Sequence, residues 1–317
     1  MRVDFGLPQR GPSDAAERPV ALTIGNFDGV HRGHRLLLDA LLAAARSIDG
    51  EAVVMTFDPH PRCVLDPDNC PQQITTLDEK RDLLRAAGVD RMVVLEFTKE
   101  LSQWTAEHFC EQLLAALPLR RLVVGHDFAL GHNRRGDIPF LRDFGVGHGF
   151  EVSTVDALEE RGEVISSSRV RAALIAADLP RANAFLGYPY FIDGWVEHGE
   201  QVGHRIGYPT ANLAVTPGKC LPARGVYAQW VKAAGEWHMA ATNVGYRPTF
   251  GGDRLTVEAF LLDFDGDLYR QRVRAAFVAR LREERTYPGV EELTAQIALD
   301  VEETRRILGG QEPPAGL

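Results

Sequence analysis

The sequence predicts an α/β protein of two parts, a parallel sheet covered by helices and then a small antiparallel barrel with a C-terminal helix. Three observations carry this prediction. In the first half, short runs rich in Val, Ile and Leu alternate with helical patterns, which is typical of strands buried between two layers of helices. From about residue 190, strand patterns follow one another between Gly, Pro and Asp turns. The chain of 317 residues is long enough for two such domains.

Strands and helices alternate in the first half. The predicted strands are 20–25, 52–57, 91–97 and 121–126, and the predicted helices are 34–47, 78–87 and 105–117. The first helix carries an apolar stripe formed by Leu37, Leu38, Leu41, Leu42 and Ala45. Ligands of parallel sheets bind beyond the carboxyl ends of the strands. The segments GNFDGVH, DPHP and GHDF, which follow three of these strands, are therefore predicted to lie at a binding site.

The pattern changes after a helical stretch at 167–187, where the segment GYPY separates the two halves. The segments FIDGWVEHG, GVYAQWVKA, EWHMAATNVG, TVEAFLLDF and QRVRAAFVARL then predict five or six antiparallel strands, as in a small barrel. Residues 290–308 follow as a long helical pattern. We therefore expect one domain at 1–186 and a second at 187–317.

The charge of the chain limits its class of ligand. The net charge is -9, whereas a general binder of nucleic acid or of an anionic membrane needs a broad basic surface. The four lysines, Lys80, Lys99, Lys219 and Lys232, all lie outside glycine-rich phosphate loops. An anionic ligand would then be met by arginine, histidine, backbone amides or a metal ion. The sequence predicts a small-molecule ligand and neither nucleic acid nor membrane as a partner.

Apolar run length and cysteine spacing limit the location. No apolar run approaches the roughly 20 residues of a membrane helix, and residues 1–19 lack the apolar core of a signal peptide. The four cysteines, Cys63, Cys70, Cys110 and Cys220, show no CxxC spacing. Neither a zinc knuckle nor a disulfide framework is predicted, and a reducing cytoplasm is the expected location.

The segment GNFDGVHRGH at 25–34 places His31 and His34 three residues apart in a glycine-rich turn. Two histidines at this spacing could bind a metal ion or could donate hydrogen bonds to a phosphate. A metal centre needs a third ligand at a definite spacing, and HxxH differs from the i, i+4 pair of zinc proteases. A helix that begins near His34 would present free amides and the positive end of its dipole. The residues therefore favour a phosphate site.

GNFDGVHRGH resembles the HxGH signature of the nucleotidyltransferase superfamily, in the form found in bifunctional prokaryotic flavokinase/FAD synthetases. The resemblance implies a Rossmann-like domain in which His31 and His34 stabilise charge on the ATP phosphates during adenylyl transfer. Further motifs follow in the family's order, namely TFDPHP at 56–61, GHDFALGHNRRGD at 125–137 and ISSSRVR at 165–171. Alone, SSSRVR would be an ordinary serine N-cap. The nucleotide-binding residues implied by these motifs are Gly25, Asn26, Asp28, Asp127, Ser167, Ser168 and Arg171.

The second half resembles riboflavin kinases, because GEQVGHRIGYPTANL at 199–213 contains their P-T-A-N signature after a glycine-rich loop. The resemblance implies nucleotide binding by Gly203, Gly207, Thr210 and Asn212. It also implies Mg²⁺ held by the oxygens of Thr210 and Asn212, which suit a hard cation. His204 and Arg205 depart from the family pattern in this loop, where G-R-T is usual.

Glu258 in TVEAFLLDF falls where the riboflavin kinase family has its catalytic base. Strand alternation would place Val257 and Ala259 on one face and Glu258 on the other, where it could reach an active site. Without the resemblance, Glu258 would be an exposed strand glutamate paired with a neighbour. Arg282 in LREERTY falls at a position near the flavin in the family. Arg270 replaces the family's glycine after the tyrosine of DLY, and Val164 stands where many relatives have arginine.

These motifs imply a bifunctional enzyme that phosphorylates riboflavin to FMN in its C-terminal domain and adenylates FMN to FAD in its N-terminal domain. ATP is the implied co-substrate of both steps, Mg²⁺ the implied cation and pyrophosphate the second product of the adenylation. The expected partners are riboflavin, FMN, FAD and ATP, and no oligomeric state is predicted. The alternatives left open are a relative with only one activity, a flavin sensor or store without turnover, and a metallohydrolase that uses the histidine pair.

Overall fold

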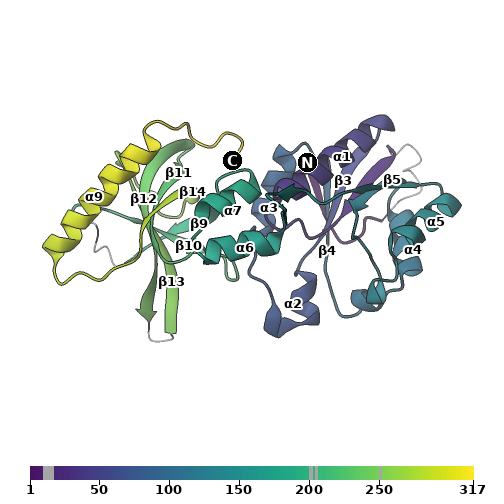
Figure 1. Ribbon diagram of the computed structural model, residues 1–317, viewed down its shortest axis with the longest axis horizontal. Helices are drawn as coiled ribbons and strands as arrows, with labels where there is room; N and C mark the ends of the chain where they lie inside the picture. Colours follow the sequence, from purple (N-terminus) through teal and green to yellow (C-terminus); the bar gives the residue numbers. More distant parts are fainter. Residues whose placement is uncertain (10–17, 200–202, 204–205, 250–251) are drawn as a thin grey trace. The chain divides into compact units, whose positions relative to one another are not determined.

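The structure is a computed structural model that describes residues 1–9, 18–199, 203, 206–249 and 252–317. His204 and Arg205, noted above as departures, lie outside these residues. The described chain forms two compact units (Figure 1). The first unit comprises Met1–Pro71 and Lys80–Ser166, and the second comprises Gln72–Glu79 and Ser167–Leu317.

The first unit is built on a six-stranded parallel sheet with the order β1-β4-β3-β2-β5-β6. The strands are β1 (Arg2–Phe5), β2 (Val20–Ile24), β3 (Glu51–Phe57), β4 (Arg91–Leu95), β5 (Leu119–Gly125) and β6 (Glu151–Val155). Every residue of β2 and of β4 is buried, as expected of central strands covered on both faces. The predicted parallel sheet is confirmed.

Helices cover both faces of this sheet. They are α1 (Arg32–Ser47), α2 (Pro61–Leu65), α4 (Ala106–Ala116) and α5 (Ile138–His148). The unit also contains the short 3-10 turns η1 (Pro67–Asn69), η2 (Leu101–Gln103) and η3 (His132–Arg134), and a hairpin formed by β7 (Glu159–Glu160) and β8 (Glu163–Val164). Val20, Leu22 and Ile24 of β2 belong to the core cluster that α4 and α5 close. Helix α1 packs on β2, β3 and β5 outside that cluster, so it covers the opposite face.

The second unit is a closed antiparallel barrel with the strand order β10-β13-β12-β11-β14-β9. The strands are β9 (Phe191–Glu197), β10 (Ala211–Val215), β11 (Gly225–Ala233), β12 (Glu236–Thr249), β13 (Gly252–Leu261) and β14 (Arg272–Arg282), and the helices are α6 (Ser167–Ile175), α7 (Leu179–Leu186) and α9 (Val290–Leu308). Helix α9 packs on β11, β12 and β14 (Figure 1). The predicted barrel with its C-terminal helix is confirmed.

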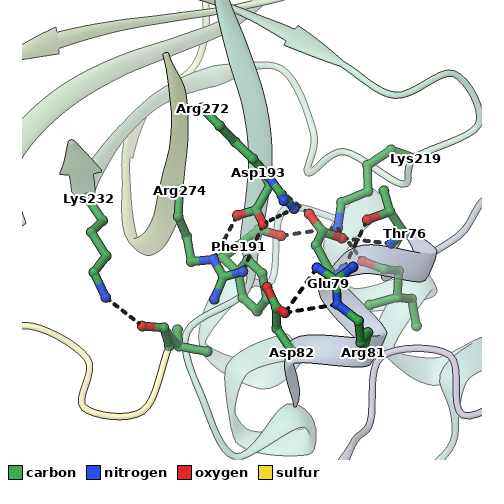
Figure 2. A network of polar contacts seen from close by, with 12 residues as sticks. Thr76, Glu79, Arg81, Asp82, Phe191, Asp193, Lys219, Lys232, Arg272 and Arg274 are labelled. Carbon is green, nitrogen blue, oxygen red and sulfur yellow. Dashed lines mark hydrogen bonds and ion pairs between the residues drawn. The ribbon is translucent and has the colours of Figure 1, made fainter. Parts of the chain in front are cut away.

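Segment Gln72–Glu79 is held in the second unit by a buried ion pair (Figure 2). Lys219 Nζ donates to Glu79 Oε2 at 2.5 Å, and both side chains are almost completely buried. Lys219 also donates to the backbone oxygens of Ile74 at 2.6 Å and Phe191 at 3.2 Å. Glu79 accepts from the N–H groups of Thr76 and Asp193 at 2.7 and 2.8 Å. Thr76 Oγ1 accepts from Glu79 N in return, which is a capping box at the start of α3 (Leu77–Ala86).

The predicted helical stretch at 167–187 is divided into α6 and α7. Ala177 has a positive φ of 61°, and Asp178 caps α7 by accepting a hydrogen bond from the N–H of Arg181. Pro180 lies in the first turn of α7, where its missing N–H costs nothing. The apolar pattern runs through this break, which explains why it predicts one stretch.

The expectation of no disulfide is wrong at one pair of cysteines. Cys63 in α2 and Cys70 after η1 form a disulfide, with their Cα atoms 4.3 Å apart. The two short helical turns reverse the chain between them, so residues seven apart in sequence become neighbours. Cys110 and Cys220 are buried thiols outside this disulfide, and burial raises the pKa of the Cys110 thiol to about 12.

Candidate active sites

The loop between β2 and α1 has an unusual backbone. Phe27, Gly29 and Val30 have positive φ values of 46°, 81° and 35°, and the side chains of Phe27 and Val30 are buried. Positive φ in an aromatic and a β-branched residue costs about 1–3 kcal/mol at each position. A fold retains such strain where the loop shape has a function, and this loop lies at the carboxyl end of β2.

His31 and His34 stack at the start of α1, with ring centroids 3.6 Å apart. His31 caps the helix, because its Nδ1 accepts a hydrogen bond from the N–H of His34 at 3.3 Å. In the neutral ring the proton therefore lies on His31 Nε2, which remains a donor. Nδ1 of His34 is buried and has no hydrogen-bond partner among the described residues. Within the pair, Nδ1 of His34 is thus the ring nitrogen that still lacks a partner in the described part of the chain.

The pKa of His34 lies well below its usual 6.5 because of burial, the neighbouring ring of His31 and the positive charge of Lys80. His34 is therefore neutral at pH 7. A neutral imidazole donates one N–H, so a ligand phosphate would meet a hydrogen-bond donor there and no charged ring.

This pKa predicts a loss of stability in acid. As pH falls below 6.5, the unfolded chain protonates His34 before the folded chain does, so the free energy of unfolding decreases. At pH 5.5 the expected contribution is about 1 kcal/mol relative to pH 7.5. Urea unfolding at both pH values should show this difference for the wild type and a correspondingly smaller one for His34→Gln. An equal pH dependence in the two proteins would contradict the neutral state of His34.

The structure brings a second loop to the histidine loop. His60 of DPHP caps α2 by accepting from the N–H of Arg62 at 3.1 Å, and its Nε2 lies 3.3 Å from the side-chain amide of Asn26. Asp127 follows β5, the neighbour of β2 in the sheet, and its backbone oxygen accepts from Arg134 at 2.7 Å. The loops after β2, β3 and β5 therefore share the carboxyl edge of the sheet, as predicted.

The remaining predicted residues of this site divide between the units. Gly33 lies beside Ile165, since a Cβ on Gly33 would be 3.4 Å from the Ile165 backbone oxygen, an ordinary van der Waals distance. The ISSSRVR motif thus begins beside the HxGH motif. Ser167, Ser168 and Arg171 lie in the first turns of α6, which belongs to the second unit. Within the described residues, no group of three or more His, Cys, Asp or Glu side chains is arranged to hold a metal ion.

In the barrel, strand register brings Asn212 and Glu258 together. Asn212 of β10 is paired with Glu258 of β13, and Glu258 is paired with Asn243 of β12. Their neighbours Val257 and Ala259 are fully buried in the barrel interior, so the three polar side chains share the outer face. This confirms the predicted alternation around Glu258.

A cavity of about 430 Å³ lies at this end of the barrel and is lined by Thr210, Asn212, Asp265, Asp267 and Tyr269. Its size is typical of small-molecule sites. Apolar side chains of Val196, Leu261, Phe264 and Leu268 complete the lining. The P-T-A-N segment and the loop after β13 therefore form one pocket with a polar side and an apolar side, which suits a nucleotide.

The donors of this pocket fit Mg²⁺. Thr210 and Asn212 supply neutral oxygens, and Asp265 and Asp267 supply carboxylates on the same cavity, which are the ligands that a hard cation prefers. The amide of Asn212 lies against Gly199, where a Cβ would collide with it. Gly203 similarly leaves room for the Tyr208 backbone oxygen and lies next to Thr210, and Gly207 has a positive φ of 84°.

Comparisons with known proteins identify both halves. A model of the FAD synthetase family matches residues 13–169, and a model of the riboflavin kinase family matches residues 186–308. The bifunctional riboflavin kinase/FMN adenylyltransferase of Escherichia coli (strain K12) is 38% identical over 303 residues, covering 95% of this chain and 96% of that protein. The chain belongs to the bifunctional riboflavin kinase/FMN adenylyltransferase family. The protein of that name from Pseudomonas fluorescens is also 38% identical, over 97% of this chain and 98% of its own.

A solved structure supports the fold of this family member. A crystal structure described as a macrolide-efflux protein from Streptococcus pneumoniae matches with a TM-score of 0.86 and 30% identity, over 96% of this chain and 99% of that one. Among the residues described here, no helix combines the length and apolar character that crossing a bilayer requires.

The sequence motifs of this bifunctional enzyme do not identify two polar residues of its kinase unit. Asn243 stands directly beside Glu258 across β12 and β13. Glu284 of LREERTY reaches over Gly245, because a Cβ on Gly245 would collide with its carboxylate. In the sequence, Asn243 stands out only as a polar residue in the predicted strand segment EWHMAATNVG. The pairing of β12 with β13 is needed to show that Glu258 is its neighbour.

Arg282 and Arg270 have structural roles in the riboflavin kinase unit. Arg282 forms a bidentate ion pair with Asp300 of α9, with Nε and Nη2 at 2.9 and 2.7 Å from its oxygens. Arg282 therefore holds α9 against β14. Arg270, which replaces a family glycine, has a φ of 61°. The turn thus keeps its glycine-type shape at a cost of about 1 kcal/mol.

Proposed function

We propose that this enzyme makes FAD in two steps at two separate sites. The barrel unit phosphorylates riboflavin with ATP to give FMN and ADP, and the parallel-sheet unit joins FMN to the adenylyl group of a second ATP, releasing pyrophosphate. The observation that carries the proposal is that each family match contains its own polar site, with His31 and His34 in one and Asn212 and Glu258 in the other.

In the kinase step, Glu258 acts as the general base. Its carboxylate takes the proton of the ribityl 5′-hydroxyl as that oxygen attacks the γ-phosphorus of ATP. The bond from the γ-phosphorus to the β,γ-bridging oxygen breaks, and ADP leaves. Asn212 beside it and Thr210 hold the nucleotide end of the pocket, and Gly203 and Gly207 let the backbone approach the phosphates. Mg²⁺, when held by Thr210 and Asn212, would neutralise phosphate charge. Arg282 is proposed to support the flavin end of the site through its ion pair with Asp300.

In the adenylyl transfer, no side chain of the enzyme forms a covalent bond. A phosphate oxygen of FMN attacks the α-phosphorus of ATP, a P–O bond forms, and the bond to the pyrophosphate oxygen breaks. His31 and His34 donate hydrogen bonds to the charge that develops on the phosphates. Further nucleotide contacts are proposed for Gly25, Asn26, Asp28, Asp127, Ser167, Ser168 and Arg171.

Domain limits and location form part of the proposal. We assign residues 1–186 to the adenylyltransferase and 187–317 to the kinase, in line with family matches that end at 169 and begin at 186. The compactness of the chain instead groups α6 and α7 with the barrel. Both reactions consume ATP, so we place the enzyme in the cytoplasm.

The proposal is tested by incubating the purified protein with riboflavin, ATP and Mg²⁺ and separating the flavins by chromatography over time. FMN should appear first and FAD second. FMN without FAD would refute the adenylyltransferase assignment, and FAD formed only from added FMN would refute the kinase assignment. Omission of Mg²⁺ should stop both steps.

His31→Ala is expected to remove FAD formation and to leave FMN formation intact. The change removes both the phosphate donor and the cap of α1, so the rate of FAD formation from FMN should fall by about 10²- to 10³-fold. Initial rates with FMN or with riboflavin as the only flavin substrate measure the two steps separately. Loss of FMN formation in folded protein would show that His31 does not serve one site alone.

A further inference from the structure

Lys80 is a buried cation that the mechanism above does not use. It lies on α3 in the first unit, and only 7% of its surface is exposed. Burying an ammonium group costs several kcal/mol unless its surroundings compensate. A methionine of similar length would fill the same space without that cost. We therefore expect the positive charge of Lys80 to have an electrostatic role that offsets the cost of its burial.

Hydrogen bonds connect Lys80 to the histidine loop. Lys80 Nζ lies 3.2 Å from Thr56 Oγ1, and Thr56 Oγ1 lies 3.1 Å from the backbone oxygen of Asn26. An ammonium group only donates, so the threonine hydroxyl accepts from Lys80 and must give its own proton to Asn26. The side chain of Asn26 in turn contacts His60. These hydrogen bonds thus connect Lys80 to the loop after β2, which contains Asn26, and to the loop after β3, which contains His60.

The charges around Lys80 belong to the same loops. Asp28, which is 5% exposed, follows β2, and Asp58 follows β3. Burial lowers the pKa of Lys80, whereas these two carboxylates act to raise it. The positive charge of Lys80 in turn lowers the pKa of His34 on α1. One cation therefore interacts with titratable groups from three separate elements at the edge where the phosphates are proposed to bind.

We propose that Lys80 is a positioning residue for adenylyl transfer, which holds the Asn26 loop and the carboxylates of Asp28 and Asp58 in the arrangement that receives ATP. The inference rests on the proposed adenylyltransferase function. A fixed charge beneath the loop stabilises its strained backbone before ATP arrives, and such preorganised groups need no rearrangement during the reaction. The positive charge of Lys80 also helps to keep His34 neutral as the pH falls, because it lowers the pKa of that imidazole.

The test measures FAD formation from FMN and ATP between pH 6 and pH 8 in the full-length enzyme. Lys80→Met removes the charge and keeps the length of the side chain, and kcat/KM should fall by about 100-fold. Without the cation, His34 protonates at higher pH, so the deficit should be about threefold larger at pH 6 than at pH 8. A purely structural role would lower activity by the same factor at both. Lys99→Met, at an exposed position of the same unit, should stay within about twofold of the wild type.

Each outcome decides the proposal. If the wild type forms no FAD from FMN, the proposed function fails before Lys80 is tested. If the wild type forms FAD and Lys80→Met behaves like Lys99→Met, or has a deficit independent of pH, the positioning role is refuted. Should Lys80→Met not fold, Thr56→Val interrupts the same hydrogen-bond path with little change of shape. It should lower kcat/KM by about tenfold with unchanged riboflavin phosphorylation, and a wild-type value would overturn the proposal.

Discussion

Glu258→Gln should abolish FMN formation while FAD formation from added FMN continues. The glutamine amide keeps the size of the side chain and its place between Asn212 and Asn243, but it cannot accept a proton. General bases contribute roughly 10²- to 10⁴-fold to the rate, so kcat for riboflavin phosphorylation should fall by that factor. Chromatography of the flavins with riboflavin or FMN as the starting substrate measures both steps on one preparation.

Glu236→Gln is the matched control. Glu236 is an exposed glutamate at the start of β12, paired with Ala233 at the tip of the β11–β12 hairpin, and its replacement should leave both activities unchanged. If Glu258→Gln still forms FMN at the wild-type rate, Glu258 is not the base. If a folded Glu258→Gln protein loses both activities, the assignment of the two steps to separate sites is wrong.

Burial explains which strands the sequence predicts. β2 and β3 are central strands with nearly continuous apolar residues, and their apolar runs stand out in the sequence. β1 and β6 are the two edges of the sheet, and their residues are largely polar or exposed. An edge strand buries little apolar surface, so RVDF and EVSTV carry no clear strand signal.

The apolar pattern does not predict helix α5, although the sequence of this helix contains end signals. Asp137 accepts from the N–H of Phe140, Pro139 lies in the first turn, and Gly149 ends the helix with a φ of 77°. These are an N-cap, a proline at the start and a glycine at the end, which together predict a helix. Here capping residues carry more information than the apolar pattern.

The motifs identify side chains that are close in sequence, but not their partners. His31 and His34 are three residues apart, so their closeness is visible in the spacing alone, whereas the stacking of their rings is seen only in the structure. The pairing of Glu258 with Asn243 depends on the register of β12 and β13. The positions of Glu79 and Lys80 are equally hidden in the sequence. The polar pattern of their helix would suggest charges exposed to solvent, whereas both side chains are buried. Charged residues are rarely buried unless they are paired, and a single sequence does not show the pair.

Lys219→Met is expected to destabilise the second unit by about 3–5 kcal/mol, because it leaves Glu79 as a buried carboxylate without its cation. Two N–H groups would still donate to Glu79, but the backbone oxygens of Ile74 and Phe191 would also lose a donor (Figure 2). Urea unfolding followed by tryptophan fluorescence measures the effect. Three of the four tryptophans, Trp195, Trp230 and Trp237, lie in the second unit, so the signal is dominated by it.

Two further variants separate loss of the ion pair from loss of packing. Lys232 donates to the backbone oxygen of Leu317 at 3.2 Å and lies over the Trp237 ring, so Lys232→Met should cost no more than about 1 kcal/mol. Adding Glu79→Gln to Lys219→Met removes the buried negative charge and retains an acceptor for the N–H of Thr76. The double variant should therefore be more stable than Lys219→Met alone, because a missing partner costs more than a missing pair. If the second change instead lowers stability further, the energy of this contact lies in the helix cap and the packing of Lys219, and the buried charge is not what makes the single variant unstable.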